Sequence, residues 1–93
     1  MTFSLANKVA LVTGSSTGLG KAIAFALGRA GATVALNYNN NEARARNALA
    51  EYEGEGLKGK IYRANVIDED EVNAMVATIK ADFGALDILV LNA

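Results

Sequence analysis

The sequence predicts an α/β fold built around a parallel β-sheet, because strand-like and helix-like segments alternate along the whole chain. Short, mainly apolar runs without polar alternation are typical of strands that are buried on both faces. Between these runs, apolar residues recur every three to four positions, as they do on one face of an α-helix. The segments follow the order β-α-β-α-β-α-β, and right-handed crossovers then give a doubly wound sheet with helices on both faces.

The first half of the chain contains two predicted strands and one predicted helix. The first strand is predicted at residues 9–12, where four apolar residues are followed by Thr13-Gly14. A helix follows and ends at Gly31, a position typical of a helix-terminating glycine. Its apolar stripe has helical spacing and consists of Leu19, Ala22, Ile23, Ala26, Leu27 and Ala30. The second strand is predicted at residues 33–36, and the polar residues 39–41 can cap the next helix.

The second half adds two helices and two strands. The third strand is predicted at residues 61–64 and the fourth at 86–91, while glycines at 54, 56 and 59 break the chain. Asp68, with Glu71 three residues later, resembles a capping box, and Gly84 ends the helix that starts there. The two helix stripes are Ala45, Ala48, Leu49 and Tyr52, and then Val72, Met75, Val76, Ile79 and Phe83. We expect the strand order 3-2-1-4. In such a sheet a ligand binds at the switch point between strands one and four.

Composition limits the domain size and excludes several chemistries. A chain of 93 residues allows one small domain, and its apolar share of 52% suits a piece of a larger core. Without cysteine and histidine it has no disulfide, thiolate nucleophile, Ser-His-Asp triad or imidazole metal site. The net charge of −1 offers no basic patch to nucleic acid and no run of like charge to a membrane surface. Since no apolar run reaches the roughly 18 residues of a membrane span, and no signal peptide is recognisable, a cytoplasmic chain is expected.

The most informative segment is the loop Thr13–Gly20, between the first strand and the first helix. At that junction an open α/β sheet binds its ligand, and the helix N-terminus offers unpaired N–H groups to a phosphate. The spacing differs from the dinucleotide fingerprint G-x-G-x-x-G. The triphosphate loop G-x-x-x-x-G-K-[ST] would need glycine at Ser15 and a hydroxyl residue at Ala22. The loop fits a third pattern, T-G-x-x-x-G-x-G, throughout.

With this loop, the chain resembles the N-terminal part of a classical short-chain dehydrogenase/reductase, a family with a Rossmann-type sheet. Asn65-Val66 is similar to that family's adenine-contacting pair, and residues 87–93 are similar to its fourth strand leading into N-N-A-G. Lys8–Gly14 and the Asn65-Val66 variant resemble the 3-oxoacyl-carrier-protein reductases and their sugar- or polyol-oxidising relatives. Leu91 departs from the first Asn of N-N-A-G, and Thr17 stands where many NADP-dependent members carry Arg or Lys.

The resemblance implies a role for each candidate cofactor-binding residue. Gly14 and Gly18 permit the turn, and Gly20 allows the helix to pack on the strand. Ser16, Thr17 and Leu19 are the implied contacts to diphosphate, ribose and nicotinamide. Asn65 and Val66 are implied at the adenine, although a plain strand-to-helix turn is the alternative. The implied cofactor lining is completed by Asn92 and Ala93.

The end of the second strand bears on the choice of cofactor. Residues 37–40 occupy the region where an acidic residue would hold the ribose of NAD, and no acid is present. NADP is therefore favoured over NAD, with Asn37, Tyr38 and Asn39 as candidate contacts, although Tyr38 could equally be a surface turn residue. Two interpretations stay open for Arg44 and Arg46: they reach the 2′-phosphate of NADP, or they are solvated helix residues. The acidic run 68–71 fits helix capping better than a metal site.

These inferences predict residues 1–93 to be the cofactor-binding portion of one truncated domain. The whole protein would be an NAD(P)-dependent oxidoreductase that moves a hydride between nicotinamide and a carbonyl or alcohol. The resemblance places its catalytic Ser, Tyr and Lys downstream, so no catalytic residue is expected here. The expected partners are a small-molecule substrate and further copies of the protein in a dimer or tetramer, without nucleic acid or membrane. The alternatives are a non-catalytic nucleotide-binding module and an inactive fragment.

Overall fold

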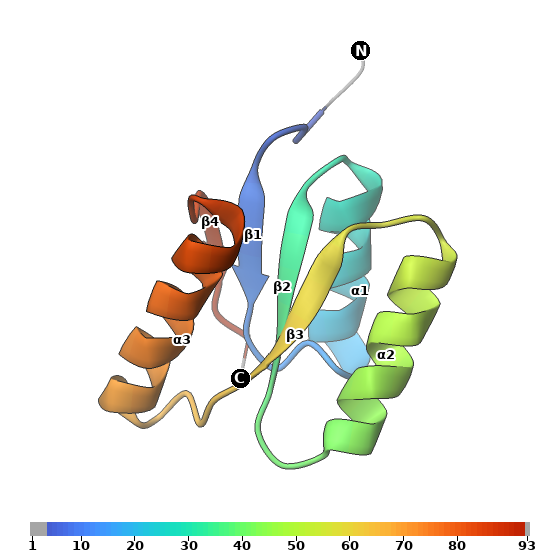
Figure 1. Cartoon of the computed structure of the whole chain (residues 1–93). Coiled ribbons are helices and arrows are strands. Elements are labelled where there is room, and N and C mark those ends of the chain that lie inside the picture. The colour runs from blue at the N-terminus through green and yellow to red at the C-terminus, as the bar shows by residue number, and fades with distance from the viewer. Residues whose placement is uncertain (1–3, 93) are drawn as a thin grey trace.

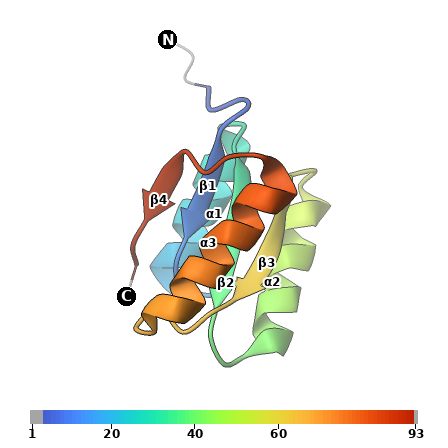
Figure 2. The ribbon, with the colours of Figure 1, turned by 60° about the vertical axis from the view of Figure 1, so that its left-hand side comes forward.

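The computed structural model describes residues 4–92, which form four strands and three helices (Figure 1). The strands are β1 (Val9–Val12), β2 (Thr33–Tyr38), β3 (Gly59–Arg63) and β4 (Ile88–Val90). The helices are α1 (Gly18–Arg29), α2 (Glu42–Gly54) and α3 (Glu69–Phe83). All neighbouring strands pair in parallel, in the order β3-β2-β1-β4. The predicted fold class and strand order are confirmed, and β4 lies at one edge of the sheet beside β1 (Figure 2).

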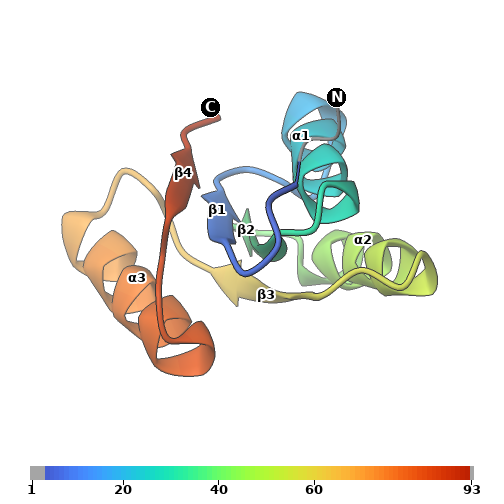
Figure 3. The same cartoon turned by 90° about the horizontal axis from the view of Figure 1, so that it is seen from above.

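The sheet is covered on both faces, with α1 and α2 on one side and α3 on the other (Figure 3). Successive residues of β1 alternate between two cores. Ala10 and Val12 pack with Phe25 and Tyr52 of the α1–α2 side, whereas Leu11 packs in the α3 cluster. Because every residue of β1 is buried, the prediction of a strand buried on both faces is confirmed.

The buried face of α1 differs from the predicted stripe. Leu19, Ala22 and Ala26 of that stripe are exposed in the described structure, while Gly20 and Ala24 are buried against the sheet. Small residues let a helix approach a sheet closely, but they give little hydrophobic signal in a sequence. The helix was therefore predicted correctly and its orientation was not.

Three strand boundaries also differ from the predicted ones. β2 extends to Tyr38, and β4 contains only Ile88–Val90. β3 starts at Gly59, which the sequence analysis assigned to a chain break. Gly59 is paired beside Val34, and a Cβ atom there would lie 2.2 Å from the Val34 carbonyl oxygen. The glycine therefore belongs to the strand because the two backbones approach closely.

The exposed edge at β4 predicts that the 93-residue chain alone self-associates. Leu89 is 54% exposed and lies on an edge strand, the kind of surface that pairs with other chains. Sedimentation velocity of the purified chain should show oligomers, and Leu89→Lys should reduce them. Ile67→Lys, which changes an exposed apolar residue in a loop, should have a smaller effect. A monomer with one cooperative unfolding transition would contradict this prediction.

Tyr52 makes the stability of the fold sensitive to high pH. Its ring packs edge-on against Phe25 at 5.3 Å, and its hydroxyl donates to the Lys58 carbonyl at 2.8 Å. Burial raises the pKa of Tyr52 from 10.0 to about 12. Because the folded state holds this proton more tightly than the unfolded state, the stabilisation is complete below pH 10.0 and is lost as the pH rises towards 12.

Alkaline denaturant titrations should therefore show a falling free energy of unfolding in this interval. Burial and then the hydrogen bond to Asp82 also raise the pKa of Tyr62, and burial raises the pKa of Tyr38, so three groups contribute. In Tyr52→Phe the decline should be shallower, since one of the three titrating tyrosines is removed and Tyr38 and Tyr62 remain. An unchanged slope in that variant would contradict the role of Tyr52.

Candidate functional site

The candidate site lies at the carboxyl edge of the sheet, where the strand ends and the loops after them meet (Figure 1). These segments are the loop 13–17 before α1, the end of β2 with Asn39 directly after it, the turn 64–68 before α3, and Leu91-Asn92 after β4. Of the predicted cofactor-binding residues, Ala93 lies outside the described residues. The others are all in these segments or in the first turn of α1.

The glycine loop has a defined shape held by the neighbouring strand. Gly14 and Gly18 have φ angles of 57° and 59°, in the left-handed region that favours glycine. Ser15 is buried, and its hydroxyl donates to the Val12 carbonyl at 2.7 Å and accepts from the Asn37 N–H at 2.9 Å. The Ser15 N–H in turn donates to the Asn37 carbonyl at 3.0 Å. The loop is thus attached to β2 by two hydrogen bonds between Ser15 and Asn37.

Asn37 lies beneath this loop. Its side chain is buried, with the residue 3% exposed, and its Oδ1 accepts from the Gly14 N–H at 3.0 Å. Its Nδ2 donates to the carbonyls of Ala64 and Tyr62 at 3.2 and 3.3 Å. The amide therefore joins the glycine loop to the end of β3.

Asn92 closes the loop from the side of β4. Its N–H donates to the Thr13 hydroxyl at 2.8 Å, and its Nδ2 donates to the Gly14 carbonyl at 3.2 Å. A Cβ atom at Gly20 would lie 2.3 Å from the Gly14 carbonyl oxygen and 2.6 Å from Asn92 Nδ2. The first turn of α1 can therefore pack against the loop only because residue 20 is glycine.

The N-terminus of α1 differs from those of the other two helices. Asn41 and Asp68 cap α2 and α3 through their side chains, and acidic residues follow in both first turns. Thr17 precedes α1 without a side-chain capping bond, and the first turn of α1 contains no acidic residue. The positive end of this helix dipole and its free N–H groups are thus open to an external anion.

The remaining candidates form the rim of the site. Leu19 is 70% exposed, and Thr17, Gly18, Asn39 and Val66 are also exposed. Ser16, Tyr38 and Asn65 are partly buried, and the Tyr38 hydroxyl donates to Glu42 at 3.2 Å. Burial, with Glu42 as the second cause, raises the pKa of Tyr38. Arg46, one of the two arginines considered for a phosphate, instead pairs with Glu42 at 3.5 Å.

The turn after β3 is shaped by its own side chains. Asn65 Oδ1 accepts from the Ile67 N–H at 3.2 Å, and the Asn65 N–H donates to the Glu71 carboxylate at 3.0 Å. The predicted capping box is therefore half formed: Asp68 accepts from the Glu71 N–H, but the Glu71 side chain returns to Asn65. No cluster of possible metal ligands occurs among residues 4–92.

Arg63 also lies at this edge of the sheet, and no sequence pattern singled it out as a candidate site residue. It ends β3 directly beside Tyr38 of β2, and its guanidinium donates to both the backbone and side-chain oxygens of Asn39. The predicted strand order 3-2-1-4 already implies this position, because it places the end of strand three beside the end of strand two.

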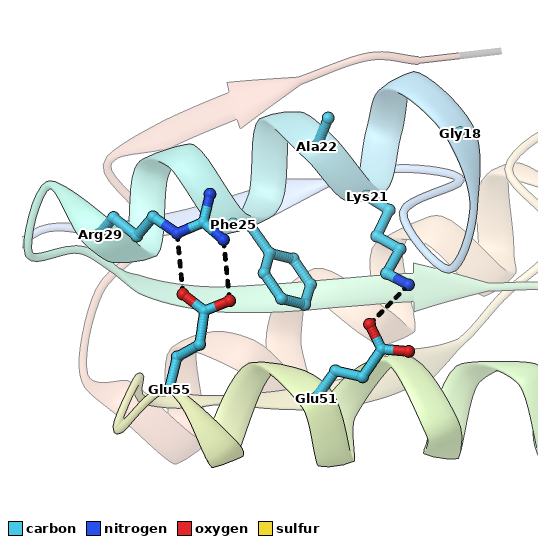
Figure 4. Close-up of a pocket in the computed structure, with 7 residues that line it drawn as sticks. All are labelled: Gly18, Lys21, Ala22, Phe25, Arg29, Glu51 and Glu55. Atoms are coloured by element: carbon cyan, nitrogen blue, oxygen red, sulfur yellow. Dashed lines mark hydrogen bonds and ion pairs between the residues drawn. The ribbon is translucent and has the colours of Figure 1, made fainter.

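A groove of about 340 Å³ between α1 and α2 is separate from this edge (Figure 4). It is crossed by the ion pairs Lys21–Glu51 at 2.9 Å and Arg29–Glu55 at 2.8 Å, on either side of Phe25. Its lining shares only Gly18 with the candidate cofactor residues. Since its charges already neutralise one another, the groove is a poor anion site compared with the start of α1.

Within the described part of the chain, no helix combines the length and the apolar character needed to cross a bilayer.

Comparison with known proteins relates this geometry to a family. Residues 8–93 match the model of the short chain dehydrogenase family. The chain is 50% identical over 91 residues to 2-dehydro-3-deoxy-D-gluconate 5-dehydrogenase of Formosa agariphila. This match covers 98% of the present chain and 34% of the Formosa protein. It is 43% identical over 86 residues to a 3-oxoacyl-[acyl-carrier-protein] reductase of Staphylococcus aureus, covering 92% of this chain and 35% of that protein.

A solved structure gives the same result. A short chain dehydrogenase from Burkholderia cenocepacia, crystallised in complex with NADP, superimposes with a TM-score of 0.89 at 42% identity. The match covers 96% of this chain and 36% of that one. The chain thus spans about a third of the length of the proteins it matches. It belongs to the short chain dehydrogenase family.

Proposed function

We propose that the complete protein is an NAD(P)-dependent oxidoreductase and that this chain supplies its cofactor-binding portion, as the N-terminal part of a single domain. The observation that carries the proposal is the uncapped start of α1 behind a fixed glycine loop. Such a start binds phosphate through N–H groups and the helix dipole. The bound nicotinamide would give a hydride to a carbonyl substrate or accept one from an alcohol substrate.

Each part of the carboxyl edge has a proposed role. The loop Gly14–Gly18, with the hydroxyls of Ser16 and Thr17, would hold the diphosphate and the adjoining ribose, and Leu19 would contact the nicotinamide. Asn65 and Val66 would contact the adenine, and Asn92 with Ala93 would line the nicotinamide side. Tyr38 and Asn39 would face the adenosine ribose. Asn37 would act from below by fixing Gly14.

NADP is the favoured cofactor. An acidic side chain at the end of β2 would repel a 2′-phosphate, and residues 37–41 contain none. The nearest acid on α2, Glu42, is engaged by Arg46 and by the Tyr38 hydroxyl. The related structure from Burkholderia cenocepacia supports this choice because it contains NADP.

The catalytic groups would lie outside these 93 residues. The family resemblance places a Ser, a Tyr and a Lys downstream, and the chain contains neither His nor Cys to replace them. The substrate would be a small carbonyl or alcohol, in keeping with the names of the related proteins. A cytoplasmic location and a homo-oligomer, either dimer or tetramer, complete the proposal.

Turnover assays test this function. The complete protein should oxidise NADPH in the presence of a 3-oxoacyl thioester, or reduce NADP+ in the presence of 2-dehydro-3-deoxygluconate, which would lose a hydride from its C5 alcohol. The 93-residue chain alone should show no turnover with the same substrates. Activity of the short chain would contradict the placement of the catalytic groups. Cofactor binding by the complete protein without turnover on any carbonyl would favour a non-catalytic nucleotide-binding module.

A further inference from the structure

We infer that Arg63 and Glu71 form a charge pair that sets the preference for a cofactor with a phosphate on its adenosine ribose. The inference rests on the proposed function, since it concerns the adenosine end of the same site. Neither residue belongs to the glycine loop or to the end of β2. They come from β3 and α3, and the fold brings them to the cofactor edge.

Arg63 fixes the orientation of Asn39. Its Nε donates to the Asn39 carbonyl at 3.1 Å, and its Nη2 donates to Asn39 Oδ1 at 2.9 Å. With Oδ1 held by the guanidinium, the Nδ2 group of Asn39 is the part left to meet a ligand. An arginine has five N–H donors, and two of those on Arg63 have no partner among residues 4–92. Asn39 and Arg63 together thus offer several donors and a positive charge at one point.

Glu71 connects this point to the adenine turn. Its carboxylate pairs with Arg63 Nη1 at 2.6 Å and accepts from the Asn65 N–H at 3.0 Å. A single carboxylate therefore holds the guanidinium that orients Asn39 and also the backbone of the proposed adenine contact. The same negative charge offsets part of the field of Arg63.

The charges around this point make the two residues act in opposite directions. Arg63 attracts a phosphate dianion, and its side chain is 50% exposed, so a ligand can reach it. Glu71 opposes the dianion. The other nearby carboxylate, Glu42, is paired with Arg46 and bound by Tyr38. Loss of the Arg63 charge should therefore weaken phosphate recognition, and loss of the Glu71 charge should strengthen it.

Calorimetric titration of the complete protein with adenosine 2′,5′-bisphosphate and with 5′-AMP tests this inference. Arg63→Met should lower the affinity for the bisphosphate by about tenfold or more, as expected for the loss of charge-assisted hydrogen bonds. Its affinity for 5′-AMP should change less than about twofold, because that ligand lacks the 2′-phosphate. Glu71→Gln keeps an acceptor for the Asn65 N–H and should raise the affinity for the bisphosphate.

Arg29→Met is the matched control, because Arg29 is also an exposed arginine paired with a glutamate and lies at the far end of α1. It should leave both affinities unchanged. Equal losses for both ligands in Arg63→Met, or losses in both Arg63→Met and Glu71→Gln, would show a structural role and overturn the inference. If the unmodified protein binds neither NADP nor NAD, the proposed function itself fails. If it binds them and only the variants disagree, the inference alone fails.

Discussion

Replacement of Gly20 by alanine is expected to reduce cofactor affinity by about tenfold or more, because a displaced loop would lose at least one hydrogen bond to the charged diphosphate, worth about 1.5–3 kcal/mol. The added Cβ atom would meet the Gly14 carbonyl oxygen at 2.3 Å and Asn92 Nδ2 at 2.6 Å. Backbone atoms cannot rotate away as a flexible side chain can, so the loop must shift from the start of α1. Overpacking of this kind also costs about 1–3 kcal/mol of stability. Fluorescence titration with NADPH, together with denaturant unfolding, measures both effects in the complete protein.

Gly54→Ala is the control for this substitution. Gly54 lies at the end of α2, and a Cβ atom there would meet nothing within 4 Å. Stability and NADPH affinity should stay close to those of the unmodified protein. Wild-type affinity in Gly20→Ala would show that the loop does not need this close packing, and the proposed role of Gly20 would be wrong.

Replacement of Asn37 by aspartate is expected to destabilise the protein by about 3 kcal/mol at neutral pH, the usual cost of a buried unpaired charge. The amide donates to the carbonyls of Tyr62 and Ala64, and a carboxylate has no proton to give them. The Gly14 N–H would keep an acceptor, but the contact to β3 would become repulsive. The loop would lose one of its two supports, and NADPH affinity should fall with stability.

Acid should partly rescue Asn37→Asp, because protonation of the new carboxyl restores one donor. The difference in unfolding free energy from the unmodified protein should therefore shrink as the pH is lowered and grow as it is raised. Asn73→Asp, at an exposed position on α3, should show no such pattern. A pH-independent loss in Asn37→Asp would mean that the damage comes from changed shape and not from charge.

The main elements and the position of the site follow from local sequence patterns. Thr13–Gly20 predicts both the turn and its ligand, since the left-handed residues Gly14 and Gly18 and the start of α1 are close in sequence. The alternation of strands and helices predicts a doubly wound parallel sheet, and the order 3-2-1-4, one of the two common orders of such sheets, is confirmed. Local structure of this kind can be predicted from the sequence because the residues that determine it lie within a few positions of one another.

The errors and omissions concern contacts between distant segments. The buried face of α1 is formed by Gly20, Ala24, Phe25 and Gly28, and three of these residues are too small to stand out in a hydrophobic pattern. The contacts of Asn37 and Arg63 depend on which strand ends become neighbours in the sheet. Asn37, for example, donates to the Tyr62 carbonyl, which lies 25 residues later in the sequence. The sequence shows that these residues are polar, but only the packed sheet shows what they hold.

Hydrogen–deuterium exchange of the complete protein with and without NADPH tests the central claim most directly. Binding at the carboxyl edge should slow exchange in peptides that cover the glycine loop 13–20, the end of β2 and the turn at Asn65-Val66. The α1–α2 groove around Glu51 and Glu55 should exchange at an unchanged rate. Protection confined to that groove, or no protection at saturating NADPH, would contradict the assignment of this edge as the cofactor site.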